Sequence, residues 1–208
     1  MPRNKQKQID EVCSFENVFC EPCVDGKYFE NDAPLILEIG CGYGHYTIAM
    51  AERFPEKNFL GVDKKGDRIW NASKNASKLS LKNAGFVRIL IEEIGDFFPE
   101  GSVDEIWITF PDPFSKPCKH KKRLTSARFL AIYKRLLKPD GILHFKTDNL
   151  KLFDYSVEVV REHGEILEEV RDVHGGSDGP QILREVLTHY EGKFMDKGPI
   201  YYLRFRIS

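Results

Sequence analysis

Short apolar runs alternate with helical patterns along most of this chain of 208 residues. The first run, residues 35–39, leads into a glycine-rich turn at 40–44, and a helical pattern follows at 46–54. The same order recurs at 58–62 and 66–81, at 86–91 with a short connection after it, and at 103–108 and 126–137. Strands interleaved with helices form a parallel sheet covered on both faces, so the sequence predicts an α/β fold.

The C-terminal part of the chain changes pattern. A strand at 142–145 and a helix at 150–163 continue the alternation, but 166–170 and 200–207 both read as strands. We predict that these two form an antiparallel pair at one edge of a mostly parallel sheet of about seven strands. The glycine-rich segment 175–180 between them lacks the Lys-Ser/Thr ending of a phosphate-binding loop, so we interpret it as a flexible connection.

The bulk composition limits the class of protein. At 41% hydrophobic residues the chain can bury one ordinary core, and no linker divides residues 31–208, which we interpret as one domain. Residues 1–30 show no clear period, and we treat them as an N-terminal extension and a candidate for partial disorder. No run approaches the roughly 18 consecutive apolar residues of a membrane span, and no signal peptide is visible. We therefore expect a soluble, cytoplasmic protein without membrane contact.

The five cysteines predict reduced thiols rather than a disulfide framework, because the chain shows no export signal. Cys20 and Cys23 have the spacing of half a zinc site, with Cys13 upstream. No second pair of cysteines or histidines completes that site, so we predict no metal.

Acidic residues mark the same end of each predicted strand. In strand order, the acids that end or follow the five strands are Glu38, Asp63, Glu92 with Glu93, Asp112 and Asp148. Any one of them is more often a solvated loop residue. Ligands of open α/β sheets, however, bind outside the carboxyl ends of the strands. Acids at five successive strand ends therefore predict a shared cleft.

The glycine turn favours a cationic ligand over a dinucleotide. Its glycines are Gly40, Gly42 and Gly44. His45 stands where a dinucleotide-binding turn has glycine or alanine, and Glu38 before the turn would repel a pyrophosphate. S-adenosylmethionine carries an amino group and a sulfonium and suits this turn better. Asp63 is then placed to hold its ribose hydroxyls, and Glu93, or less favourably Glu92, to meet its adenine.

A dense run of basic residues follows Asp112. With 31 Lys and Arg against 32 Asp and Glu, the formal charge is −1, so affinity for nucleic acid must come from local patches. Charge runs are usually solvated loops, but this one follows a candidate catalytic acid directly. We predict that it contacts phosphates of folded RNA without reading sequence. The predicted contacts are Lys116, Lys119, Lys121, Lys122 and Arg123.

Four motifs occur in order along the chain. They read Glu-Ile-Gly-Cys-Gly-Tyr-Gly at 38–44, Phe-Pro-Asp-Pro at 110–113 before the basic run, Phe-Lys-Thr-Asp-Asn at 145–149, and Thr-His-Tyr-Glu at 188–191 followed by Gly-Pro-Ile-Tyr at 198–201. The first motif alone is common to many methyltransferases. The ordered set resembles the tRNA (guanine-N7)-methyltransferases, class I S-adenosylmethionine-dependent enzymes, from about residue 35 to the end of the chain.

The resemblance implies a Rossmann-like, doubly wound sheet and methyl transfer to N7 of a guanine in the variable loop of tRNA. It implies that the cofactor and catalytic pocket is lined by Glu38, Asp63, Glu93 and Asp112. It implies that substrate contacts come from Lys116, Asp148, Thr188, His189, Tyr190 and Glu191. Phe114 and the pair Cys118-Lys119 depart from the tryptophan and Arg-His of many bacterial members, which affects details of base and backbone contact. The short chain resembles the members that act without a partner subunit, as a monomer or homodimer.

The chemistry favours Asp112 as the catalytic residue. Guanine N7 bears a lone pair and no proton, so methylation there needs no general base and depends on positioning. A carboxylate near the ring stabilises the positive charge that develops and accepts hydrogen bonds from N1-H and the exocyclic amine. An acid between two prolines is more often a rigid exposed turn, but the place of Asp112 after the fourth strand favours function. Asp148 and Glu191 could share in orienting the base.

Two other functions fit parts of the pattern. The sequence at 110–114 loosely resembles the Asp/Asn-Pro-Pro-aromatic motif of adenine and cytosine amino-methyltransferases, but Phe114 takes the place of the second proline. A non-catalytic RNA-binding protein on the same fold would predict an eroded cofactor site, whereas the acids and glycines are all present.

Overall fold

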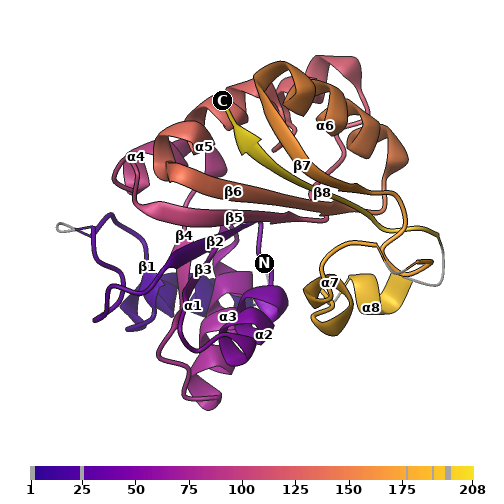
Figure 1. The fold of residues 1–208 in the computed structure, drawn as a ribbon. Helices are drawn as coiled ribbons and strands as arrows, with labels where there is room; N and C mark the ends of the chain where they lie inside the picture. Colours follow the sequence, from indigo (N-terminus) through magenta and orange to yellow (C-terminus); the bar gives the residue numbers. More distant parts are fainter. Residues whose placement is uncertain (1–2, 24–25, 177, 189, 195–197) are drawn as a thin grey trace.

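The computed structural model of the protein describes residues 3–23, 26–176, 178–188, 190–194 and 198–208. The strands are β1 (Val18–Phe19), β2 (Leu35–Ile39), β3 (Asn58–Asp63), β4 (Ala84–Arg88), β5 (Val103–Thr109), β6 (Leu137–Thr147), β7 (Gly164–Val170) and β8 (Tyr201–Ile207). They form one eight-stranded sheet in the order β1-β4-β3-β2-β5-β6-β8-β7 (Figure 1). Neighbouring strands run parallel except where β8 pairs with β6 and with β7.

Helices cover both faces of this sheet. They are α1 (Arg3–Glu11), α2 (His45–Arg53), α3 (Gly66–Lys78), α4 (Ile94–Phe97), α5 (Ala127–Leu136), α6 (Leu150–His163), α7 (Ile182–Glu185) and α8 (Glu191–Phe194), with 3-10 turns η1 (Val12–Ser14), η2 (Ile91–Glu93) and η3 (Pro117–Lys122). Helices α4, α5 and α6 pack on one face, and α1, α2, α3 and α7 lie on the other (Figure 1). Each face has its own buried cluster, so the predicted doubly wound α/β fold is confirmed.

Local patterns explain the elements that carry the site. Four of the five residues of β2 are buried, as expected for a strand with a neighbour on each side and helices on both faces. In α3 the buried residues include Ile69, Ala72 and Ala76, whose spacing of three and four puts them on one side of the helix. Asn149 caps α6, since its side chain accepts a hydrogen bond from Leu152 N at 2.9 Å. Helix α6 has the predicted bounds.

The strand order reverses between β2 and β5. The strands β3, β4 and β1 continue from β2 toward one edge, and β6, β8 and β7 continue from β5 toward the other. At such a switch point the loops after the two central strands diverge and leave a crevice for ligands. The glycine turn follows β2 and the loop at 110–114 follows β5, so the fold places both predicted motifs at this crevice.

The N-terminal segment is more regular than the sequence predicts. Helix α1 packs against α3, Val12 is fully buried, and β1 pairs with β4 as an eighth strand. Cys13 and Cys20 form a disulfide with a Cα distance of 5.8 Å, so the expectation of reduced thiols is wrong for this pair. The chain reverses between η1 and β1, which brings the two cysteines together. Residues 24–25 of this extension lie outside the described residues.

The C-terminal strands pair as predicted, with one refinement. β7 and β8 are antiparallel, but β8 lies between β6 and β7, so β7 is the edge strand. The flexibility expected of 175–180 stays a prediction, and Ser177 lies outside the described residues. No helix in the described ranges is long and apolar enough to cross a membrane.

Candidate active site

The glycine turn holds its backbone in a conformation that side chains disfavour. Gly40, Gly42 and Gly44 have φ values of +79°, +57° and +70°. A Cβ on Gly44 would lie 2.6 Å from a ring carbon of Phe86 and 2.7 Å from Ala72 Cβ, so this glycine allows α2 to start against the sheet and α3. A Cβ on Gly40 would meet nothing within 4 Å. The turn is therefore packed on one side and open on the other, where a ligand can approach the backbone.

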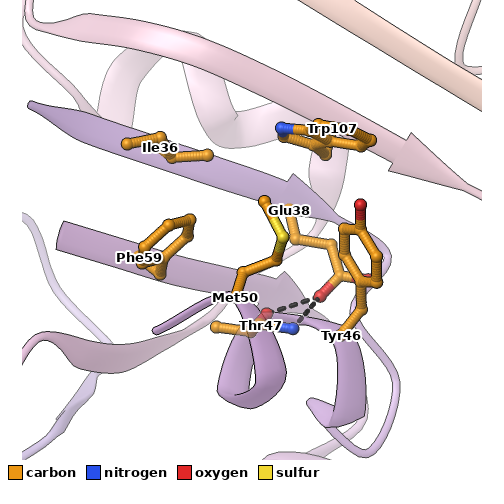
Figure 2. Close-up of a pocket in the computed structure, with 7 residues that line it drawn as sticks. All are labelled: Ile36, Glu38, Tyr46, Thr47, Met50, Phe59 and Trp107. Atoms are coloured by element: carbon orange, nitrogen blue, oxygen red, sulfur yellow. Dashed lines mark hydrogen bonds between the residues drawn. The ribbon is translucent and has the colours of Figure 1, made fainter. Parts of the chain in front are cut away.

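Glu38 lies beneath this turn in what we call the Glu38 cluster, formed with Thr47 and Thr109. The Glu38 side chain accepts hydrogen bonds from Thr47 N at 2.9 Å, from the Thr47 hydroxyl, and from Thr109 Oγ1 at 2.8 Å. It also lines a small, mostly apolar pocket with Met50 and Trp107, among others (Figure 2). Both carboxylate oxygens are thus engaged by the protein. The cluster joins the ends of β2 and β5 to the first turn of α2.

Burial dominates the electrostatics of Glu38. It is 5% exposed, and burial raises the pKa of its carboxyl from the ordinary value of 4.5 to about 7, although hydrogen bonds from Thr47 and Thr109 act in the opposite direction. The sequence predicts that Glu38 faces a cationic ligand. The structure shows a carboxylate whose oxygens are engaged by Thr47 at the start of α2 and by Thr109 at the end of β5.

Asp63 bridges the turn to the end of β3. Its Oδ2 accepts a hydrogen bond from Gly42 N at 3.1 Å, and its Oδ1 accepts one from Lys65 N at 2.9 Å. The side chain is partly exposed, so it stays available at the open side of the turn. Glu92 and Glu93 are exposed on η2 after β4, at the same edge of the sheet.

The loop after β5 presents Asp112 from a strained backbone. Phe110 and Phe114 have φ values of +46° and +41°, which cost of order 1–3 kcal/mol each and persist only where the surroundings enforce them. Phe110 N donates to Lys146 O at 2.8 Å, and Arg123 Nε donates to Pro113 O at 3.0 Å. Asp112 between these anchors is exposed. Its position is therefore fixed while its carboxylate remains open to a ligand.

The basic segment is mostly available for phosphate contact. Lys116, Lys119, Lys121 and Lys122 are exposed on and beside η3. Arg123 corrects the prediction, because it is 5% exposed and its guanidinium lies 4.3 Å from the centre of the Tyr155 ring. Since Arg123 also holds Pro113, it supports the Asp112 loop rather than presenting a free cation to RNA.

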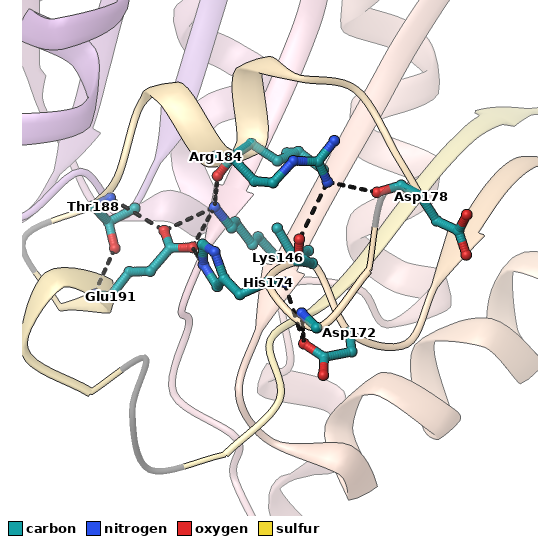
Figure 3. A network of polar contacts seen from close by, with 10 residues as sticks. Lys146, Asp172, His174, Asp178, Arg184, Thr188 and Glu191 are labelled. Carbon is teal, nitrogen blue, oxygen red and sulfur yellow. Dashed lines mark hydrogen bonds and ion pairs between the residues drawn. The ribbon is translucent and has the colours of Figure 1, made fainter.

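A buried group of polar residues, which we call the Lys146 cluster, anchors the C-terminal segment (Figure 3). Lys146 and Glu191 are both fully buried, and Lys146 Nζ lies 2.7 Å from the Glu191 carboxylate. His174 Nε2 is 2.7 Å from Glu191 Oε1. Burial lowers the pKa of Lys146, and the Glu191 carboxylate opposes that shift. The cluster links the end of β6 to the start of α8 through Glu191 and to the loop before α7 through His174.

Thr188 and Glu191 form a reciprocal cap. Glu191 N donates to Thr188 Oγ1 at 3.0 Å, and Thr188 N donates to the Glu191 carboxylate at 3.3 Å. Both residues are buried, so the structure assigns them to shaping the turn rather than to the direct substrate contact that the sequence predicted. His189 lies outside the described residues.

Tyr190 is the member of this motif that reaches the site surface. It is 42% exposed, its hydroxyl donates to Asp148 Oδ2 at 3.0 Å, and its ring centre lies 5.1 Å from that of Phe110. The contact brings the end of β6 and the loop after β5 together with a residue far along the chain. Asp148 and Tyr190 thus remain candidates for contact with a base.

Sequence reasoning missed four residues that position the site, namely Thr47, Thr109, Lys146 and His174. Thr47 and Thr109 carry no visible motif, because a threonine near a strand end is common. Lys146 gave a usable signal, since a lysine in the apolar run 142–147 is rarely buried without a partner. Its partners Glu191 and His174 are distant in sequence, so no local pattern identifies them.

Comparison with known proteins gives the family. A family model described as "Putative methyltransferase" matches residues 32–203. The tRNA (guanine-N(7)-)-methyltransferase of Christiangramia forsetii is 40% identical over 99% of both chains. That of Bacteroides thetaiotaomicron is 38% identical over 100% of this chain and 87% of its own.

Solved structures show the same fold at low identity. The 16S rRNA methyltransferase KamB aligns with a TM-score of 0.63 at 14% identity, over 84% of this chain and 88% of that one. A variant 16S rRNA (adenine(1408)-N(1))-methyltransferase from Catenulisporales acidiphilia, solved with S-adenosylmethionine, aligns with a TM-score of 0.60 at 14% identity, over 96% and 90% of the two chains.

The fold and the site at its switch point therefore define a Rossmann-like methyltransferase. More narrowly, the chain belongs to the tRNA (guanine-N7)-methyltransferase family.

Proposed function

We propose that this protein transfers a methyl group from S-adenosylmethionine to N7 of a guanine in tRNA. The observation that carries the proposal is the convergence at one switch point of the glycine turn, Asp63, Asp112 and Asp148, in a chain that is 40% identical to a curated enzyme of this activity over nearly its whole length. Following the family resemblance, we place the target guanine in the variable loop.

The residues present fit the cofactor. A Cβ on Gly40 would meet no other atom within 4 Å, so a ligand has room to approach the backbone there. The left-handed conformation of this turn favours glycine, which leaves the backbone without side chains. Asp63, Glu93 and Asp112 would provide carboxylates toward its ribose, its adenine and its cationic end, and Glu38 would keep the turn in place from below. When bound, S-adenosylmethionine supplies an electrophilic methyl group.

The substrate side of the site would work by positioning. Asp112 would accept hydrogen bonds from the guanine edge and stabilise the positive charge of the product, with no proton to remove from N7. Asp148 and Tyr190 would orient the base from β6, and Lys116, Lys119, Lys121 and Lys122 would hold backbone phosphates. Following the family resemblance, we propose that the protein acts as a monomer or homodimer without another protein. We place this activity in the cytoplasm.

Methyl transfer from labelled S-adenosylmethionine to unmodified tRNA, followed by nucleoside analysis, tests the proposal. We expect label in 7-methylguanosine. Asp112→Asn should lower kcat/KM by about 100-fold or more, because it removes charge at the point where positive charge develops. Asp140→Asn is the matched control, since Asp140 is also an exposed acid after a proline but lies at the far end of β6.

Other outcomes lead to other functions. Label on an adenine or cytosine amino group would favour an amino-methyltransferase. Tight tRNA binding with no transfer would favour a non-catalytic RNA-binding protein.

A further inference from the structure

A second cationic surface borders the site described above. It is a hollow bounded by α1, the glycine turn, the start of α3 and the end of β4, and we call it the cationic hollow. Its charged lining residues are Lys5, Lys64, Lys65, Asp67, Arg68 and Arg88. Helices α1 and α3, which form part of it, lie on one face of the sheet (Figure 1).

Positive charge in the hollow is largely uncompensated. Asp67 is the one acid among its described lining residues, and Lys5 Nζ lies 2.9 Å from its Oδ2. Lys64, Lys65, Arg68 and Arg88 form no ion pair with a described carboxylate. Four cations around one hollow are a marked local excess in a chain whose formal charge is −1.

The arginines are held in place by the fold. Arg88 Nη1 donates to Ile9 O at 3.4 Å, and a Cβ on Gly66 would lie 3.1 Å from Arg88 Nε, so this glycine lets the guanidinium rest against the start of α3. The Arg68 guanidinium lies 5.6 Å from the ring centre of Tyr43 in the glycine turn. Part of the charge is therefore positioned in advance, which lowers the entropy cost of gathering it around an anion.

The start of α3 adds to this field. The helix has thirteen residues, and its N-cap residue Lys65 provides no side-chain hydrogen bond to the first turn. Backbone N–H groups at such an end, together with the helix dipole, favour an anion. Cations from α1, from the connection between β3 and α3, from α3 and from β4 thus line the same hollow as this helix end.

We propose that the cationic hollow binds a phosphate of the tRNA backbone, as a contact separate from the basic segment at 116–122. The hollow lies beside the carboxyl ends of β3 and β4, whereas the basic segment follows β5, so the two surfaces flank the glycine turn along one edge of the sheet. An RNA that presents its guanine at the Asp112 loop could then be held on both sides of the cofactor turn. This inference rests on the proposed function and adds a backbone contact that determines affinity, not the choice of base.

The test is a comparison of tRNA affinity across salt concentrations for the wild type and the double variant Lys64→Gln, Lys65→Gln. We expect weaker binding and a plot of log K against log salt that is shallower by roughly 0.7–0.9, the change that the loss of one phosphate contact produces. Lys78→Gln is the matched control, since Lys78 is exposed at the other end of α3. The variant Lys121→Gln, Lys122→Gln gives the reference effect for the basic segment. Wild-type affinity and slope in the Lys64, Lys65 variant would overturn the proposal.

Steady-state kinetics separate this inference from the proposed function. If wild type methylates tRNA, the Lys64, Lys65 variant should show a several-fold higher KM for tRNA with kcat retained, as expected when binding is lost equally in ground and transition states. If both proteins methylate tRNA with the same KM, the proposed phosphate contact in the hollow is wrong and the proposed function is still supported. A wild type that transfers no methyl refutes the function, and the binding experiment still decides whether the hollow contacts tRNA.

Inorganic phosphate distinguishes the source of the anion. If phosphate titrates into the free wild type with a stoichiometry that the double variant loses, while tRNA affinity is the same in both, the hollow is a site for a free anion. That result would overturn the assignment to tRNA. Phosphate that competes with tRNA in the wild type and competes less well in the variant would support it.

Discussion

The Glu38 cluster and the Lys146 cluster both contain a buried carboxylate, but they hold it in opposite ways. Glu38 accepts hydrogen bonds from neutral donors of Thr47 and Thr109, and burial raises its pKa to about 7. Glu191 lies against the cation of Lys146 and the ring of His174. The first acid can become neutral without losing its partners, whereas the second cannot do so without leaving a buried cation alone.

This difference matches what each cluster supports. The Glu38 cluster joins elements that are already close together, the ends of the neighbouring strands β2 and β5 and the first turn of α2, so neutral hydrogen bonds suffice. The Lys146 cluster ties a segment with little sheet contact, from α7 to α8, to the interior of the molecule. Removing one member of a buried ion pair leaves the other member's charge buried alone. Here the pair holds Glu191, the residue next to Tyr190, whose hydroxyl donates to Asp148 Oδ2.

Breaking the ion pair between Lys146 and Glu191 should have the largest effect on the free energy of unfolding. Glu191→Gln leaves the Lys146 ammonium buried without a counter-charge, which should lower the free energy of unfolding by about 3–5 kcal/mol, measured by urea denaturation. The double variant Lys146→Met, Glu191→Gln should be more stable than the single variant, because it removes the unpaired charge. A single variant as stable as the double variant would show that the pair is not coupled in this way.

The pH dependence of stability should distinguish the two clusters next. Because the folded pKa of Glu38 is raised from 4.5 to about 7, the native state binds the proton more tightly than the unfolded chain does. Its contribution is therefore full below pH 4.5 and is lost as the pH rises toward 7, by up to about 3 kcal/mol. Glu38→Gln should flatten the unfolding free energy over this window relative to wild type. A parallel pair of curves would exclude a raised pKa.

Removing one hydrogen-bond donor to Glu38 should lower the free energy of unfolding by a smaller amount. Thr109→Val should cost about 1–2 kcal/mol, and the cost should grow with pH because the bond is stronger to the charged acid. Thr125→Val is the control, since Thr125 is fully buried and its Oγ1 meets the neutral Ser156 hydroxyl at 2.6 Å. Its cost should not change with pH, and equal pH profiles for the two variants would contradict the assignment.

The smallest change in stability is expected at Tyr190. Tyr190→Phe removes a hydrogen bond between two exposed residues, so the free energy of unfolding should stay within about 0.5 kcal/mol of wild type. Methyl transfer should nevertheless fall by about three- to tenfold in kcat/KM, because Asp148 loses the donor that orients it. Unchanged kinetics would remove Tyr190 from the substrate site.

The sequence alone determined the features that depend on local pattern. The alternation of apolar runs and helical segments specified the sheet, since periodicity and turn residues act within a few positions. The glycine turn and the acids after the strands could be assigned to one edge because parallel strands bring their carboxyl ends together. The exposure of Asp112 and of most of the basic run also follows from local pattern, because proline-flanked turns and runs of charged residues are usually exposed.

Only the tertiary structure decided which of these residues are free to act. Arg123 is enclosed under the Asp112 loop, Glu191 is buried against Lys146, and Glu38 is engaged by Thr109, although the members of the last two pairs are 45 and 71 residues apart in the chain. The disulfide and the place of β8 between β6 and β7 likewise depend on distant segments. Whether a side chain is buried, and which residue it contacts, depends on segments that are distant in the sequence and meet in space. The sequence pattern therefore identifies the chemical groups but not the neighbours that bury them or pair with them.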